Sequence, residues 1–183
     1  MIRPFIDRSP IIHETAFVAD SADVIGDVRL GRDSSIWFNA TVRGDVHRIR
    51  IGNESNVQDN AVIHVTHGTA PTTIGDRVTI GHSAVVHGCT IRNEVLIGIG
   101  SIILDHTVVG TQSIVGAGAL VTGGMEIPPR SMVLGVPARV VRPLTDEEVA
   151  TLSDYASNYV RYKNIFTGVE TPDTNPFYTP TDD

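Results

Sequence analysis

Three histidines, His64, His82 and His87, fall within one short stretch of this 183-residue chain. Neutral imidazoles are good ligands for Zn²⁺, and three of them leave a fourth position open for water. A zinc ion held in this way lowers the pKa of its bound water to about 7, which makes hydroxide available at neutral pH. Co²⁺ and Fe²⁺ accept the same three ligands. Whether the three histidines form one site depends on the elements that position them.

Aliphatic residues recur with a six-residue period along most of the chain. The twenty positions are Ile12, Val18, Val24, Leu30, Ile36, Val42, Ile51, Val57, Ile63, Ile74, Ile80, Val86, Ile91, Ile97, Ile103, Val109, Val115, Val121, Ile127 and Val133. The 3.6-residue period of an α-helix does not explain this pattern, whereas a hexapeptide β-helix does. The sequence therefore predicts an all-β solenoid of about seven triangular coils, with three hexapeptides in each coil and the aliphatic side chains inside.

The repeat ends near residue 143, and a helix is expected to follow it. Thr145 and Glu148 have the spacing of a capping box, and an amphipathic stripe continues to about Phe166. The chain thus divides into a β-helix over 1–143, a C-terminal helix over 144–166 and an extended or mobile tail over 167–183. About twenty helical residues span roughly 30 Å, which matches the height of seven coils. We expect the helix to lie along the solenoid, antiparallel to its axis.

The repeat also predicts which residues stack, because residues three hexapeptides apart lie on one face in successive coils. Arg43, His64 and His87 share one column, while His82 shares a second column with Asp59 on a different face. His82 therefore cannot easily meet the other two histidines within one chain. A closed homotrimer would bring His82 of one subunit to His64 and His87 of the next, giving three shared metal sites.

Two interruptions of the repeat border this column. The step from Ile63 to Ile74 contains an insertion over residues 65–73, and a shorter insertion lies between Val42 and Ile51. Insertions in a solenoid bulge from one face, often the binding face. Any one of these histidines alone could be an ordinary surface or interface residue. Two that stack beside loop insertions, with a third on another face, favour a metal site.

Composition excludes several other functions. The chain has 14 Lys and Arg against 21 Asp and Glu, a net charge of −7, so no general basic face is expected for nucleic acid or anionic membranes. There is no apolar run of membrane length, and residues 1–10 lack the layout of a signal peptide, so a cytoplasmic location is expected. Cys89 is the single cysteine, which excludes an internal disulfide and favours a small packed residue.

Three segments around the histidines resemble the gamma-class carbonic anhydrases and their relatives in the hexapeptide-repeat superfamily. The segments are Val42-Arg43-Gly44-Asp45, residues 56–64 (NVQDNAVIH) and residues 80–89 (IGHSAVVHGC). Residues 135–138 and the final helix match as well, so the resemblance covers roughly residues 5–166. The spacing of the three histidines is its most specific part, because the hexapeptides alone also fit many acyltransferases.

This resemblance implies a left-handed β-helix and a set of site residues. It implies that His64, His82 and His87 bind the metal ion. It implies that Arg43 and Asp45 form a structural ion pair at the subunit interface. A plain salt bridge that only holds the subunits together is an equally good interpretation of this pair.

The remaining roles are also implied by the resemblance. Gln58 and Asp59 would orient the metal-bound water and bicarbonate, and Asp59 could accept a hydrogen bond from a ligand. Tyr159 falls in a region that reaches the site in bacterial relatives, although a packing role suits it as well. The archaeal prototype of this family has a glutamate directly after the Arg-x-Asp motif and a proton-shuttling glutamate in the loop after the first ligand. This chain has Val46 at the first position and no glutamate in the loop. His67 in that loop could shuttle protons or could be a plain loop residue.

The expected function is the reversible hydration of CO₂ to bicarbonate by a zinc-bound hydroxide at a trimer interface. The missing glutamates predict that the activity is low or depends on conditions. The alternatives are a metal-assisted thioesterase or other hydrolase, a CoA-dependent acyltransferase and a non-catalytic scaffold.

Overall fold

The computed structural model describes residues 1–178. The elements are β1 (Ile2–Arg3), β2 (Ile11–Ile12), β3 (Phe17–Val18), β4 (Asp23–Leu30), β5 (Ser35–Ile36), β6 (Thr41–Ile51), β7 (Asn56–Val57), β8 (Val62–His64), β9 (Thr72–Ile74), β10 (Thr79–Ile80), β11 (Val85–His87), β12 (Thr90–Ile91), β13 (Leu96–Ile97), β14 (Ile102–Ile103), β15 (Val108–Val109), β16 (Ile114–Val115), β17 (Leu120–Val121), β18 (Glu126–Ile127), β19 (Ser131–Gly135), β20 (Ala138–Pro143) and α1 (Asp146–Phe166).

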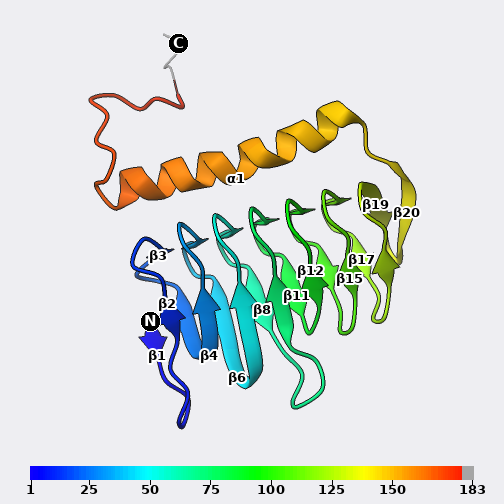
Figure 1. Ribbon diagram of the computed structural model, residues 1–183, viewed down its shortest axis with the longest axis horizontal. Helices are drawn as coiled ribbons and strands as arrows, with labels where there is room; N and C mark the ends of the chain where they lie inside the picture. Colours follow the sequence, from blue (N-terminus) through cyan, green and yellow to red (C-terminus); the bar gives the residue numbers. More distant parts are fainter. Residues whose placement is uncertain (179–183) are drawn as a thin grey trace.

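Short parallel strands stack into a β-solenoid of about seven coils (Figure 1). Successive coils form three faces. The first face contains β8, β11, β14 and β17; the second contains β3, β5, β7, β10, β13, β16 and β19; the third contains β9, β12, β15 and β18. The antiparallel strand β20 pairs with β19 at the C-terminal end. The predicted β-helix with a C-terminal helix is confirmed.

The aliphatic column of the repeat forms the core. Apart from Ile12 and Val18, which are partly buried, every one of the twenty positions is at most 4% exposed. The small residues four places later, such as Ala61 and Ala84, are fully buried at the corners. One aliphatic side chain from each face therefore fills the interior of each coil, and the driving force for stacking is burial of these side chains.

Most corners are turned by a residue with a left-handed backbone, three places after an inward aliphatic residue; Gly100, Gly118 and Gly124 are three of these residues. Ten non-glycine residues at this offset have φ between 53° and 62°: Asp33, Asn39, Glu54, Asn60, Arg77, Ser83, Glu94, His106, Gln112 and Arg130. Non-glycine residues are uncommon in this region of backbone space. The corner position is thus fixed by the spacing of the inward residues more than by the residue type at the turn.

The strands β4 and β6 are longer than the others and run around a corner. Both join the first face to the third, with a change of register between Gly26 and Val28. The insertion expected between Val42 and Ile51 is therefore part of the extended strand β6, which pairs with β4 through residues 41–44 and 49–51. As a result, Arg43 and Asp45 are held on a strand beside the histidine column.

Helix α1 runs back along the solenoid from the last coil to the first (Figure 1). Thr145 caps it, and the predicted capping box with Glu148 is present. At its N-terminal end Asp146 pairs with Arg130, and at its C-terminal end the buried Lys163 amine donates hydrogen bonds at 2.9 Å to Asp33 and to the Thr15 carbonyl. These contacts confirm the antiparallel orientation expected for the helix.

The described part of the tail, residues 167–178, turns back against α1. The ring of Phe177 lies 4.7 Å from that of Tyr162, and Arg161 stacks over Phe177 while pairing with Glu170. The end of the predicted tail, residues 179–183, lies outside the described residues. Among residues 1–178, no helix combines the length and the hydrophobicity needed to cross a membrane.

Candidate metal centre

His64 and His87 end neighbouring strands of the first face and lie side by side. Strands β8 and β11 pair in register, with His87 directly opposite His64. The Nδ1 atom of His64 lies 3.1 Å from Nε2 of His87, and both side chains are largely buried, at 18% and 29% exposure. Two nitrogen ligands of one tetrahedral zinc ion are about 3.3 Å apart, given Zn–N bonds of about 2.0–2.1 Å. The pair is therefore spaced as two ligands of one metal ion would be.

Asp45 on β6 supports this pair from the preceding coil. Its carboxylate lies 3.1 Å from Nε2 of His64 and also pairs with Arg43. Partial burial raises the pKa of Asp45, but hydrogen bonds from His64 and Arg43 outweigh this effect and lower the pKa below its usual value. The predicted Arg43–Asp45 ion pair forms within one chain, and the same carboxylate contacts a predicted ligand.

His64 is held in the form that binds metals. Partial burial lowers its pKa, and the positive charge of Arg43 acts in the same direction, whereas the hydrogen bond to Asp45 raises it; the net effect is a lower pKa than usual. His64 is therefore neutral at physiological pH. A neutral imidazole has the lone pair that a metal ion requires.

Asp105 was not predicted as a site residue. It follows β14 on the next coil, and its Oδ1 atom lies 2.5 Å from Nδ1 of His87. Its other oxygen accepts a hydrogen bond from the Thr66 hydroxyl at 2.5 Å. Burial raises the pKa of Asp105, but the hydrogen bonds from Thr66 and His87 lower the pKa by more than burial raises it. The side chain is therefore a carboxylate at neutral pH. A histidine paired with a carboxylate on its outer nitrogen is typical of metal ligands.

His82 lies at the opposite edge of the first face, in the turn between β10 and β11. Its Nδ1 atom pairs with Asp59 at 2.8 Å, as expected from their shared column. His82 and His87 are five positions apart in the sequence, which corresponds to at most roughly 16 Å of extended chain. The side chains of residues 1–178 form no cluster of three or more potential metal ligands. One chain thus brings together two of the three predicted ligands, together with a carboxylate partner for each of the three.

The donor set suits zinc. Three imidazoles, each with a carboxylate within hydrogen-bond distance of one ring nitrogen, are common ligands of Zn²⁺ and are also accepted by Co²⁺ and Fe²⁺. The spacing of His64 and His87 fits the same ion. His82 is 42% exposed, so its ring is accessible from outside the chain.

Gln58 and His67 differ in their surroundings. Gln58 directly precedes Asp59 in the chain. Its side chain is buried, and its amide donates a 3.2 Å hydrogen bond to the side-chain oxygen of Asn56. His67 is exposed at the tip of the 65–70 turn, where Thr66 and Ala70 form a bridge. The turn is held close to β6, because the amide of Gly68 donates to the Val46 carbonyl. His67 is thus accessible to water near the histidine column.

Tyr159 on α1 packs against the second face. Its ring lies 5.4 Å from Trp37 and 5.2 Å from Tyr162, in edge-to-face geometry. Burial raises its pKa to about 12, and the negative charge of Asp59 contributes to the same shift, so the two groups are near one another. Tyr159 therefore both packs and borders the side of the molecule that carries His82.

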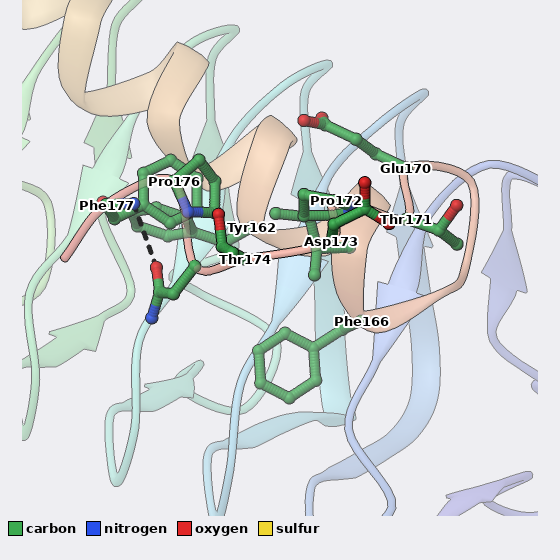
Figure 2. Close-up of a pocket in the computed structure, with 11 residues that line it drawn as sticks. Tyr162, Phe166, Glu170, Thr171, Pro172, Asp173, Thr174, Pro176 and Phe177 are labelled. Atoms are coloured by element: carbon green, nitrogen blue, oxygen red, sulfur yellow. Dashed lines mark hydrogen bonds between the residues drawn. The ribbon is translucent and has the colours of Figure 1, made fainter. Parts of the chain in front are cut away.

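A cavity of about 450 Å³ lies elsewhere, between the end of α1 and the tail. Figure 2 shows Phe177 and Pro176 folded beside Tyr162, with Phe166 and Pro172 along the same hollow. None of the three histidines lines it. The hollow results from the packing of the tail on the helix, and it is separate from the candidate metal centre.

Known proteins are similar in sequence to this chain over most of its length. The chain is 50% identical over 158 residues to "Gamma carbonic anhydrase 1, mitochondrial" of Arabidopsis thaliana, an alignment that covers 84% of this chain and 58% of the plant protein. It is 50% identical over 151 residues to "Probable carbonic anhydrase" of Methanocaldococcus jannaschii, covering 82% of this chain and 94% of that protein. No family model matches the chain.

A solved structure shows the same fold. A hexapeptide transferase family protein from Anaplasma phagocytophilum superposes with a TM-score of 0.86 at 39% identity, covering 89% of this chain and 96% of that one. The fold is thus that of a hexapeptide-repeat β-solenoid, with the histidine pair at one edge of its first face. The chain belongs to the gamma carbonic anhydrase family. It spans just under three fifths of the length of the plant relatives.

Proposed function

We propose that this protein catalyses the reversible hydration of CO₂ to bicarbonate at a zinc site shared between subunits. The observation that carries this proposal is the pair His64–His87, with facing ring nitrogens 3.1 Å apart at one edge of the first face. His82 at the other edge supplies the missing ligand in a neighbouring subunit. A bound Zn²⁺ would lower the pKa of its water to about 7 and so supply hydroxide for addition to CO₂.

The positions of the two half-sites support a homotrimer. Both edges of the first face carry ligands, so a ring in which each first face points toward the axis brings every His82 to a neighbouring pair. Three subunits then complete three sites. Such a ring needs an apolar surface along the first face.

The outward side chains of the first face meet this requirement. Val62 and Ile102 are 37% and 38% exposed and flank the outward Val85, while Ile99, next to His82 in its column, is 57% exposed. Contiguous exposed apolar side chains mark association surfaces. Helix α1 contacts Trp37 on the second face and leaves these residues uncovered.

The other polar residues have roles around the reacting molecule in this proposal. Asp59 orients His82 through Nδ1, and Gln58 beside it helps to define the water and bicarbonate position. The exposed His67 moves protons to solvent, and the Tyr159 hydroxyl donates to bound bicarbonate. Val46 offers no proton acceptor, so we expect proton transfer to limit the rate.

The test is a stopped-flow assay of CO₂ hydration on protein loaded with Zn²⁺, Co²⁺ or Fe²⁺. The proposal expects a rate above buffer in at least one form, together with one metal ion per subunit. Protein that binds metal at the three histidines but hydrates no CO₂ in any form would overturn the activity. Protein that binds no metal would overturn the site as well.

Acyl transfer and thioester hydrolysis remain the alternatives, because the Anaplasma neighbour belongs to a transferase family. The facing nitrogens of His64 and His87 favour metal binding over a single histidine acting as a base. Hydrolysis or transfer of an acetyl-CoA thioester by metal-free protein would favour these alternatives. We also retain the cytoplasmic location as a prediction.

A further inference from the structure

Asp105 occupies the centre of a hydrogen-bond chain that joins a predicted metal ligand to the neighbouring loop. One carboxylate oxygen lies 2.5 Å from Nδ1 of His87, and the other accepts from the Thr66 hydroxyl at 2.5 Å. Asp105 and His87 are 18 residues apart and lie on successive coils, in which Val86 pairs with Ile103, so the contact depends on stacking of these coils. No residue role derived above accounts for this carboxylate.

The backbone at Gly88 leaves room for the contact. A Cβ atom on Gly88 would lie 2.4 Å from the Asp105 carboxylate oxygen and 2.8 Å from Cβ of Ala70. Both distances are shorter than a non-bonded contact allows. Only glycine at this position lets Asp105 fold back along the column and reach the ring of His87. Its φ of +55° is also one that glycine adopts without a steric penalty.

The carboxylate determines which nitrogen of His87 is available. A carboxylate accepts a hydrogen bond and cannot donate one, so Nδ1 of His87 must have the proton. The lone pair is then on Nε2, the atom that faces His64 at 3.1 Å. The hydrogen bond to Asp105 also fixes the orientation of the His87 ring, which reduces the entropy lost when a metal ion binds.

Asp105 also anchors the loop. Thr66 begins the turn that contains His67, and Thr72 at the other end of the loop donates a 2.6 Å hydrogen bond to the carbonyl of His64. The loop is therefore tied to both histidines of the pair, once through a carboxylate and once through the backbone. A change at Asp105 would affect the ligand and the loop together.

We propose that Asp105 is a positioning residue that fixes the Nδ1–H tautomer of His87 for metal binding and holds the 65–70 loop against the site. This inference rests on the proposed function, because it assumes that His87 binds the metal ion. It adds a residue outside the three segments of resemblance, and it predicts a property that can be measured without any substrate.

The experiment compares the wild-type protein with Asp105→Asn, Asp105→Ala and Thr66→Val. Zinc affinity is measured by competition with a chromophoric chelator, and the His87 tautomer by long-range ¹H–¹⁵N spectra of metal-free protein. We expect affinity to fall about 10-fold in the asparagine variant and up to about 100-fold in the alanine variant. The Nδ1–H tautomer should become mixed in the alanine variant. Thr66→Val removes only the loop contact, so it should keep the affinity within about threefold of wild type.

A second pair of variants separates the contact from general destabilisation. Gly88→Ala places its methyl group against Asp105, whereas Gly124→Ala has a similar positive φ of 74° with open space around it. Both variants should lose stability, but only Gly88→Ala should lose zinc affinity in its folded fraction.

The outcomes distinguish this inference from the proposed function. If wild-type protein does not bind zinc through the three histidines, the proposed function fails and the inference fails with it. If wild-type protein binds zinc and folded Asp105→Ala binds it equally well with an unchanged His87 tautomer, the inference alone is wrong.

Discussion

At the scale of single residues, each of the three histidines has its own aspartate. Asp45 contacts His64, Asp59 contacts His82 and Asp105 contacts His87. Such partners fix the ring orientation and the tautomer, and they increase the basicity of the ligand nitrogen. The arrangement explains why two imidazoles can face each other closely in a partly buried position: each ring has a hydrogen-bond acceptor on its outer side.

Tyr159 provides a test of the side of the site that carries His82. Tyr159→Phe keeps the ring contacts with Trp37 and Tyr162, so stability and zinc content should be unchanged. Loss of one hydrogen bond to bicarbonate should lower kcat/KM about 5–10-fold, since such a bond contributes about 1 kcal/mol. The measurement is stopped-flow CO₂ hydration. Unchanged kcat/KM would assign Tyr159 to packing alone.

The pH profile gives a further check on Tyr159. Its pKa is raised to about 12, so the hydroxyl stays protonated throughout the range of a CO₂ hydration assay. The wild-type and Tyr159→Phe profiles should therefore have the same shape and differ only in height. A limb of the wild-type profile near pH 9–10 that disappears in the phenylalanine variant would contradict this assignment.

The histidines could be located from the sequence because the six-residue period converts sequence offset into position. The column of His64 and His87 and the separate position of His82 follow from counting alone, and both are confirmed. Asp105 could not be found in this way. It stacks on Gly88, one position to the side of the His87 column, and its contact with His87 exists only because Gly88 has no side chain. The signal, an aspartate stacked on a glycine beside a ligand, has meaning only once the packing of the coils is known.

At the scale of elements, α1 is tied to the first coils by a buried amine. Lys163 is 3% exposed, and its Nζ donates to Asp33 and to the Thr15 carbonyl. Nearby, Phe166 packs edge-on against Trp37 and Phe38. The helix therefore combines one specific polar contact with an aromatic cluster, which fixes its position along the solenoid.

Lys163→Met should weaken this attachment. The variant leaves Asp33 with Arg32 as its remaining ion-pair partner and the Thr15 carbonyl without its Lys163 donor. We expect a loss of about 2–3 kcal/mol in the free energy of unfolding, less than for a fully buried pair, because Asp33 keeps Arg32 and is still partly hydrated. Urea titration measures it. The exposed pair Arg142–Glu148 offers the control, since Arg142→Met should change stability far less. An equal effect of the two variants would show that burial of Lys163 is not what matters.

The same pair predicts a pH dependence. Burial raises the pKa of Asp33, but hydrogen bonds and the charge of Lys163 lower it below the ordinary 3.8. A lowered pKa stabilises the folded protein above the unfolded-state value, and this contribution is lost as the pH falls through the folded-state pKa. Acid unfolding below about pH 4 should therefore be less steep in Lys163→Met than in wild type. Identical acid dependence would contradict the assignment.

The sequence predicted the elements unevenly. The solenoid and the capping box of α1 were predicted correctly, because inward aliphatic residues and helix caps are local signals. The strand character of residues 43–50 was not predicted, because the insertion between Val42 and Ile51 interrupts the hexapeptide period there, and the strand depends on pairing with β4 on both sides of a corner. The left-handed corner residues were missed for another reason: ten of them are charged or polar residues, and glycine, which adopts this conformation freely, stands at three others, Gly100, Gly118 and Gly124.

At the scale of the whole molecule, the proposed trimer depends on the outward side chains of the first face. Ile102→Glu should dissociate the oligomer and release the metal ion while leaving the solenoid folded, because a charge cannot be buried there without a partner. Val140→Glu is the control, since Val140 is similarly exposed, at 41%, on the end strand β20. Sedimentation velocity measures the oligomer and circular dichroism the fold. An Ile102→Glu protein that remains trimeric would exclude the first face from the interface.

The central claim is that each metal ion is held by two subunits, and mixed oligomers test it directly. His87→Ala and His82→Ala subunits, with different affinity tags, are co-expressed and purified through both tags in turn. Each variant alone should bind no zinc, but every mixed trimer contains one junction where an intact His64–His87 pair meets an intact His82. We therefore expect roughly one third of the wild-type zinc content in the mixed trimers. Mixed trimers without zinc, or His82→Ala protein with the full wild-type content, would contradict the claim.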